Sequence, residues 1–100
     1  MKAYKLFRVL ADGSISSLFI NKTARLQTGK WLKAESYPTK GFSFRPHWHC
    51  TKTPEAPHLS LTGRAWYEVI IDDFEEMSRP AAQGGMWYLA NKIKILKEIE

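Results

Sequence analysis

The chain has 100 residues, of which 44% are hydrophobic and 25% are charged. This composition predicts a single domain over residues 1–100 and excludes an intrinsically disordered chain. The net charge of +5 favours anionic partners such as nucleic acid or a nucleoprotein complex. No apolar run approaches about 20 residues, and the N-terminus lacks a signal-peptide pattern, so we expect a cytoplasmic protein without a membrane partner. The single cysteine, Cys50, excludes an intramolecular disulfide and suits a reducing compartment.

The first part of the chain reads as short strands separated by turns. Tyr4–Leu10 is rich in aromatic and branched residues, which favours a strand. Asp12-Gly13 is a strong hairpin signal, so Ile15–Ile20 is expected to be the returning strand. A third strand is predicted over Lys30–Ala34, after the Thr28-Gly29 pair.

The next two strands differ in how clearly the sequence marks them. Gly41–Cys50 alternates bulky and small residues but contains Pro46, which removes a ladder donor. It is therefore expected to be an edge strand, or a strand that breaks at the proline. Ala65–Ile71 is the clearest strand in the chain.

The C-terminal third has more ambiguous periodicity. Asp72–Met77 fits one helical turn that ends at Arg79-Pro80. Two strands are expected after it, over Met86–Ala90 and Lys92–Leu96, although the apolar spacing also fits a helix. The predicted fold class is α+β and β-rich: a single small domain built on a curved, mostly antiparallel sheet with short helical turns.

Large aromatic side chains bury much area each, so we expect most of the 13% aromatic residues to form the core. At least three of the four tryptophans are expected to be largely buried. They are Trp31, Trp48, Trp66 and Trp87.

The segment Gly41–Leu59 concentrates the residues that could carry chemistry. It contains all three histidines, the only cysteine and three of the five prolines. Prolines restrict the backbone, so this segment is expected to be rigid. Rigid polar side chains suit a functional site, but they also suit a hub of hydrogen bonds that stabilises a loop.

The chain resembles a group of small uncharacterised domains from bacteriophages and integrative mobile elements of gut bacteria. The members also occur as modules of very long multi-domain polyproteins. The resemblance covers Lys2 to about Leu96, and its most specific piece is the block RPHWHC followed by APHL. This chain has His47 where the family pattern has glycine. The other matching segments are KAYKLFRV, LFI, GKWLKAE, GRAWYEV, RPAAQGGMWYLA and IKIL.

A metal site is the first chemical hypothesis for this segment. His47, His49, Cys50 and His58 offer nitrogen and sulfur donors. In an extended strand His47 and His49 share one face while Cys50 lies on the other. The glycine that the resemblance places at position 47 also argues against His47 as a ligand, so we expect no metal.

Three kinds of catalysis remain as alternatives. Acid–base chemistry would use His49, His58 and Glu68, because histidine titrates near neutrality and a carboxylate could orient it. Cys50 as a nucleophile would need an electropositive setting and a base. A histidine beside one strand and a glutamate on a later one are loosely similar to ADP-ribosyltransferases, but the first strand lacks a histidine and no Gln/Glu-x-Glu motif is present.

We interpret the chain as a binding module without a cofactor, in preference to an enzyme. The resemblance implies an accessory protein of a phage or mobile element that acts in host takeover or anti-defence. Its expected partner is a host protein or nucleoprotein complex, with nucleic acid as a further candidate. The alternative is a small enzyme that acts on a nucleotide or NAD through His49, His58 and Glu68. The residues expected to bind the partner are Arg45, His47, Trp48, His49, His58, Arg64, Gly84 and Gly85.

Overall fold

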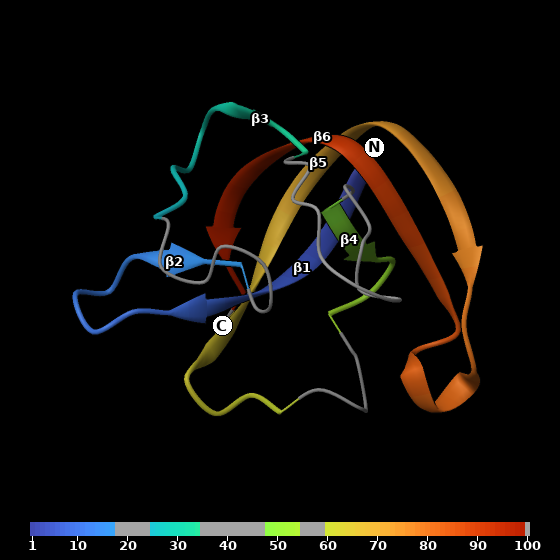
Figure 1. Cartoon of the computed structure of the whole chain (residues 1–100), viewed down its shortest axis with the longest axis horizontal. Coiled ribbons are helices and arrows are strands. Elements are labelled where there is room, and N and C mark those ends of the chain that lie inside the picture. The colour runs from blue at the N-terminus through green and yellow to red at the C-terminus, as the bar shows by residue number, and fades with distance from the viewer. Residues whose placement is uncertain (18–24, 35–47, 55–59, 100) are drawn as a thin grey trace, which may run out of the picture.

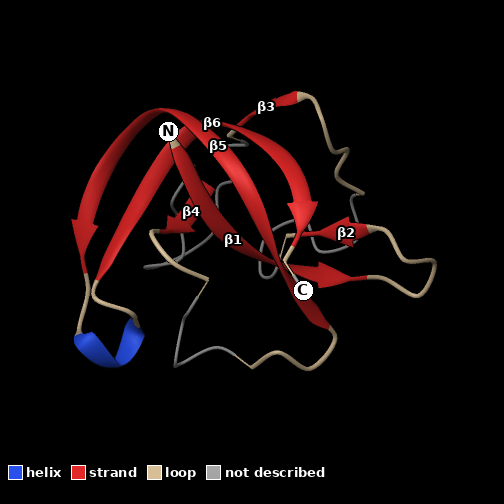
Figure 2. Ribbon diagram, turned by 180° about the vertical axis from the view of Figure 1, so that it is seen from behind, coloured by secondary structure: helices blue, strands red, loops and turns tan. Residues whose placement is uncertain are grey.

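The computed structural model describes residues 1–17, 25–34, 48–54 and 60–99. The strands in this part of the chain join one six-stranded sheet, and the pairings between them are antiparallel (Figures 1 and 2). The strands are β1 (Lys2–Val9), β2 (Ile15–Ser16), β3 (Trp31–Lys33), β4 (Trp48–Thr51), β5 (Arg64–Ser78) and β6 (Met86–Glu98).

The strand pairings close into a ring. β5 pairs with β1 on one side and with β6 on the other. β4 pairs with β6 along its whole length and meets β1 at Tyr4 and Thr51. β2 adds to the end of β1, and β3 adds to the middle of β6. The sheet is therefore strongly curved, as the arch of β5 and β6 in Figure 1 shows.

The predicted β-rich, mostly antiparallel and curved sheet is confirmed, whereas the α+β label finds little support. The one helix within the described residues is the 3-10 turn η2 (Ala81–Gln83). No helix in the described ranges is long and apolar enough to cross a bilayer.

The core lies inside the ring and follows the alternation of the strands. The five largest of its fully buried side chains come from β1, β5 and β6: Phe7, Val69, Ile71, Ile93 and Ile95. Each buried side chain of this size stabilises the fold by about 1.5–3 kcal/mol relative to exposure. The residues between these positions of β5 and β6 point to the other face of the sheet and are less buried, whereas Trp87–Ala90 of β6 are all buried.

A corner in the β5–β6 hairpin lies at Asp73 and Asn91. Asp73 has a φ of 49°, in the left-handed region, and its Oδ2 accepts a hydrogen bond from Asn91 Nδ2 at 3.0 Å. On the far side of β6, the Asn91 carbonyl accepts from the backbone N–H of Ala34 at 2.7 Å. β6 pairs with β3 over Lys92–Lys94 and with β4 over Trp87–Ala90, so its neighbour changes at this corner.

Two predictions for the C-terminal third were wrong. Asp72–Met77 is not a helical turn but continues β5, because Phe74 and Met77 pair with Ala90 and Trp87 of β6. The expected two strands after Gly85 are one strand, Met86–Glu98, which bends at Asn91 without a break in the chain. Cross-strand pairing thus overrides the local helical preference of the acidic segment.

Other strand predictions are confirmed or fall partly outside the described residues. β1, β3 and the first half of β5 match the expected segments. The Asp12-Gly13 turn forms, with Gly13 at a φ of 86° and Leu10 N–H donating to the Ser14 carbonyl at 2.8 Å. Of the expected strand Ile15–Ile20, Ile15–Ser16 forms β2, Ser17 lies outside the strand, and positions 18–20 are not described. Of the expected strand Gly41–Cys50, the last three residues belong to β4, and positions 41–47 are not described.

Candidate functional site

The described chain places the predicted site residues in three regions. Trp48 and His49 lie on β4, and Arg64 and Glu68 lie on β5. Gly84 and Gly85 follow η2 and adopt φ angles of 97° and 79°, which suit glycine in the tight turn into β6. Three predicted residues lie outside the described residues: Arg45, His47 and His58.

His49 is held by Arg79, which the sequence did not single out. Arg79 Nη2 donates to His49 Nδ1 at 2.8 Å. Because a guanidinium has no acceptor, Arg79 is the donor and Nδ1 the acceptor in this contact. The Arg79 Cζ lies 4.4 Å from the centre of the Trp87 ring, and the backbone N–H of Arg79 donates to Gly85 at 2.6 Å.

Lys5 joins the same group from β1. Its Nζ donates to the His49 carbonyl at 2.9 Å and lies 5.7 Å and 6.0 Å from the ring centres of Phe7 and Trp48. Burial lowers the pKa of Lys5; the nearby Cys50 thiol opposes this effect, and the Arg79 charge adds to it. We call Lys5, Trp48, His49, Arg79 and Trp87 the His49 cluster.

The polar groups of the His49 cluster are used largely within the protein. The Trp87 indole N–H donates to the Gln83 carbonyl at 2.6 Å. The Trp48 indole nitrogen is buried and has no hydrogen-bond acceptor among the described residues. The His49 carbonyl holds Lys5 and the His49 imidazole holds Arg79, and ring faces lie beside both cations, which suits a hub that stabilises the fold.

Cys50 is unsuited to act as a nucleophile. Its side chain is fully buried, and burial raises the pKa of the thiol to about 11, despite the opposing charge of Lys5. The thiol is therefore protonated at neutral pH, and the thiolate is the reactive form.

Glu68 and Arg64 do not join His49. Glu68 Oε1 pairs with Lys2 Nζ at 3.0 Å, and this contact raises the pKa of Lys2. Arg64 donates to the Ser60 carbonyl at 3.1 Å. Within the described ranges, no three His, Cys, Asp or Glu side chains are grouped closely enough to hold a metal ion.

A second region, on β3 and β6, was missed as a unit by the sequence reasoning. Trp31 is 51% exposed, whereas Trp48 and Trp87 are buried and Trp66 is half-buried. Trp31 pairs with Lys94, and Lys33 pairs with Lys92. Residues directly opposite in antiparallel strands point to the same side of the sheet, so these four side chains share one outer face, which we call the Trp31 face.

The opposite side of the same strand pair faces the core. Leu32 packs against the core and pairs with Ile93, which is fully buried. The alternation of β3 and β6 therefore fixes the Trp31 face on the outside. Within the described part of the chain, Lys33, Lys92 and Lys94 form no ion pair, although Asp72 of β5 lies directly opposite Lys92 on the other side of β6.

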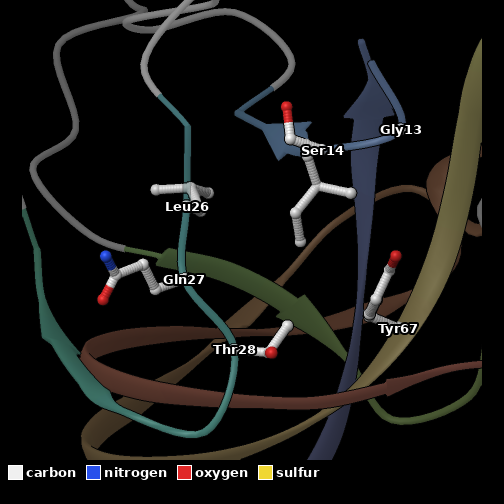
Figure 3. Close-up of a pocket in the computed structure, with 7 residues that line it drawn as sticks. Gly13, Ser14, Leu26, Gln27, Thr28 and Tyr67 are labelled. Atoms are coloured by element: carbon white, nitrogen blue, oxygen red, sulfur yellow. The ribbon is translucent and has the colours of Figure 1, made fainter. Parts of the chain in front are cut away.

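A shallow depression of about 450 Å³ lies between the β1–β2 hairpin, the segment before β3, and β5 (Figure 3). Tyr67 lines it from β5, and burial, followed by the Glu98 charge, raises the pKa of its hydroxyl. Its wide opening and mixed lining distinguish it from the enclosed, mainly apolar pockets that hold small ligands. The lining residues are Gly13, Ser14, Ile15, Leu26, Gln27, Thr28 and Tyr67.

Comparison with known proteins found no match to a protein-family model, to a curated protein or to a solved structure.

Proposed function

We propose that this protein is a binding module that recognises an anionic partner through the Trp31 face. The observation that carries the proposal is the juxtaposition of an exposed Trp31 with Lys33, Lys92 and Lys94 on one outer face of β3 and β6. An exposed large ring beside several cations suits a surface that binds a charged, partly apolar partner. The net charge of +5 supports the same sign of partner.

The His49 cluster supports binding in preference to catalysis. In an acid–base pair, a carboxylate would accept a hydrogen bond from His49 Nδ1–H and thereby orient the ring. Here Arg79 donates to that nitrogen instead, while Glu68 pairs with Lys2. The cluster therefore suits a structural role, which leaves recognition to another surface.

The resemblance to phage and mobile-element domains gives the proposal its biological setting. In that setting the protein acts in the cytoplasm of a bacterial host, as an accessory factor in host takeover or anti-defence. Its target is a host nucleoprotein complex or a host protein with an anionic surface. Such a partner would present phosphates or carboxylates to the lysines of the Trp31 face.

Chromatography on immobilised heparin, a defined polyanion, tests this surface. Lys92→Glu reverses one charge on the Trp31 face, and Lys52→Glu makes the same change at an exposed position just after β4. We expect Lys92→Glu to elute at clearly lower salt than wild type and Lys52→Glu to elute close to wild type. Equal elution of the two variants would refute the Trp31 face as the anion-binding surface.

A further inference from the structure

We propose that the Trp31 face binds single-stranded nucleic acid, with one base stacked on Trp31 and the flanking phosphates on the lysines. This inference rests on the proposed function and names the chemical class of its partner. It follows from the geometry of the face, from its charge and from the poor fit of other anionic partners.

The geometry of the Trp31 face suits a flexible strand of nucleic acid. Trp31 and Lys33 are two residues apart on one face of β3, which separates their backbone positions by about 7 Å. Lys94 lies directly across from Trp31 on β6, and Lys92 lies across from Lys33. Directly opposed Cβ atoms lie about 5 Å apart, so the long lysine side chains can reach phosphates on either side of a base stacked on the ring.

The exposed ring favours a single strand over a duplex. Stacking requires the open face of a base, which a duplex hides within its helix, whereas single-strand-binding surfaces combine basic grooves with aromatic platforms. Trp31 is 51% exposed, so its ring is available as a platform. Neighbouring Leu96, which is 37% exposed on the same strand as Lys94, extends the apolar part of the surface.

The lysines argue against a protein partner at this face. Protein–protein interfaces are depleted in lysine and enriched in arginine, and the cations of this face are all lysines. A phosphate does not require the planar, bidentate guanidinium of arginine. The flexible ammonium group of lysine also binds phosphate, as a point charge. Among anionic partners, a phosphate backbone with accessible bases therefore fits the Trp31 face best.

The test is fluorescence anisotropy of a short labelled oligothymidylate titrated with the full chain over a range of salt. We expect Trp31→Leu, which keeps an apolar side chain but loses the stacking platform, to bind roughly 5- to 150-fold more weakly. Trp31→Phe should retain most of the affinity, and Leu61→Ala, at a 60% exposed residue in the loop before β5, should bind like wild type. Lys92→Ala should lower the slope of log affinity against log salt by about 0.7.

The outcomes separate this inference from the broader proposal. If Lys92→Ala weakens binding to the oligonucleotide, its duplex and heparin alike while Trp31→Leu changes nothing, the single-strand inference fails but the anion-binding face stands. If neither substitution changes any of these affinities, both proposals fail. Tighter, Trp31-dependent binding to vesicles that contain phosphatidylserine would overturn the single-strand inference in favour of a membrane surface. Unchanged circular dichroism spectra of the variants would exclude misfolding as the cause of any loss.

Discussion

Arg79 and His49 form a hydrogen bond between two side chains of the His49 cluster. The guanidinium contacts the imidazole and the Trp87 ring, while the backbone N–H of Arg79 donates to the Gly85 carbonyl. Removing the imidazole would leave a half-buried Arg79 without this acceptor, and such a loss costs about 1–3 kcal/mol. The His49 cluster thus stabilises the junction between β4 and the β5–β6 hairpin.

We therefore expect His49→Ala to lower the free energy of unfolding by about 1–3 kcal/mol. His49→Asn should lower it less, because an amide oxygen can replace Nδ1 as the acceptor for Arg79. Urea unfolding of the three proteins, followed by tryptophan fluorescence, measures the difference. An unchanged or raised stability of His49→Ala would show that the residue serves a functional site and not the scaffold.

At this scale the sequence predicted which segment is special but not its partners. The concentration of histidine, proline and cysteine marked His49 as important, and the structure links it through Arg79 to Gly85, another predicted residue. Arg79 was interpreted only as part of the signal that ends a helical turn, because nothing local in the sequence links it to a histidine 30 residues earlier. Glu68 was a candidate by residue type, but its position on β5 pairs it with Lys2.

At the scale of elements, the corner in the β5–β6 hairpin depends on one residue with unusual backbone geometry. Asp73 adopts a φ of 49°, which aspartate tolerates better than most residues and β-branched residues tolerate poorly. Its side chain also bonds across to Asn91. The corner allows β6 to pair with β3 on one side of Asn91 and with β4 on the other.

We expect Asp73→Val to destabilise the protein by about 1–3 kcal/mol, because the left-handed conformation strains a β-branched residue. Asp73→Gly relieves that strain and loses only the bond to Asn91, so it should remain closer to wild type. The melting temperatures of the two variants give the comparison. Equal melting temperatures would contradict a requirement for left-handed geometry at this position.

The elements that sequence patterns identified were those whose signals are local. The Asp12-Gly13 turn and the branched residues of Ala65–Ile71 specify their structure within a few positions. Asp72–Met77 has a composition that suits a helix, but Phe74 contacts the Tyr88 ring edge-to-face at 5.5 Å and pairs within the β6 register. That long-range pairing could not be read from a single segment.

For the molecule as a whole, the pairing of β3 with β6 is what assembles the Trp31 face. The lysines of β6 are about 60 positions from Trp31 in the sequence, and along the chain they look like scattered, solubilising charges. The register of β3 against β6 places Lys94 opposite Trp31 and Lys92 opposite Lys33. The net charge of the sequence could predict that the partner is negatively charged, but the register of the strands is needed to identify the residues that form the surface.

The most direct measurement of the central claim is an NMR titration of the isotope-labelled protein with a short oligothymidylate. Trp31→Phe assigns the indole N–H resonance of Trp31 among the four tryptophans. We predict that this resonance and the amide resonances of residues 30–33 and 92–96 change most in chemical shift on binding. The amide resonances around His49 and Arg79 should not change. Shifts confined to His49, Arg79 and Trp87, with an unmoved Trp31 indole, would contradict the account and place recognition at the His49 cluster.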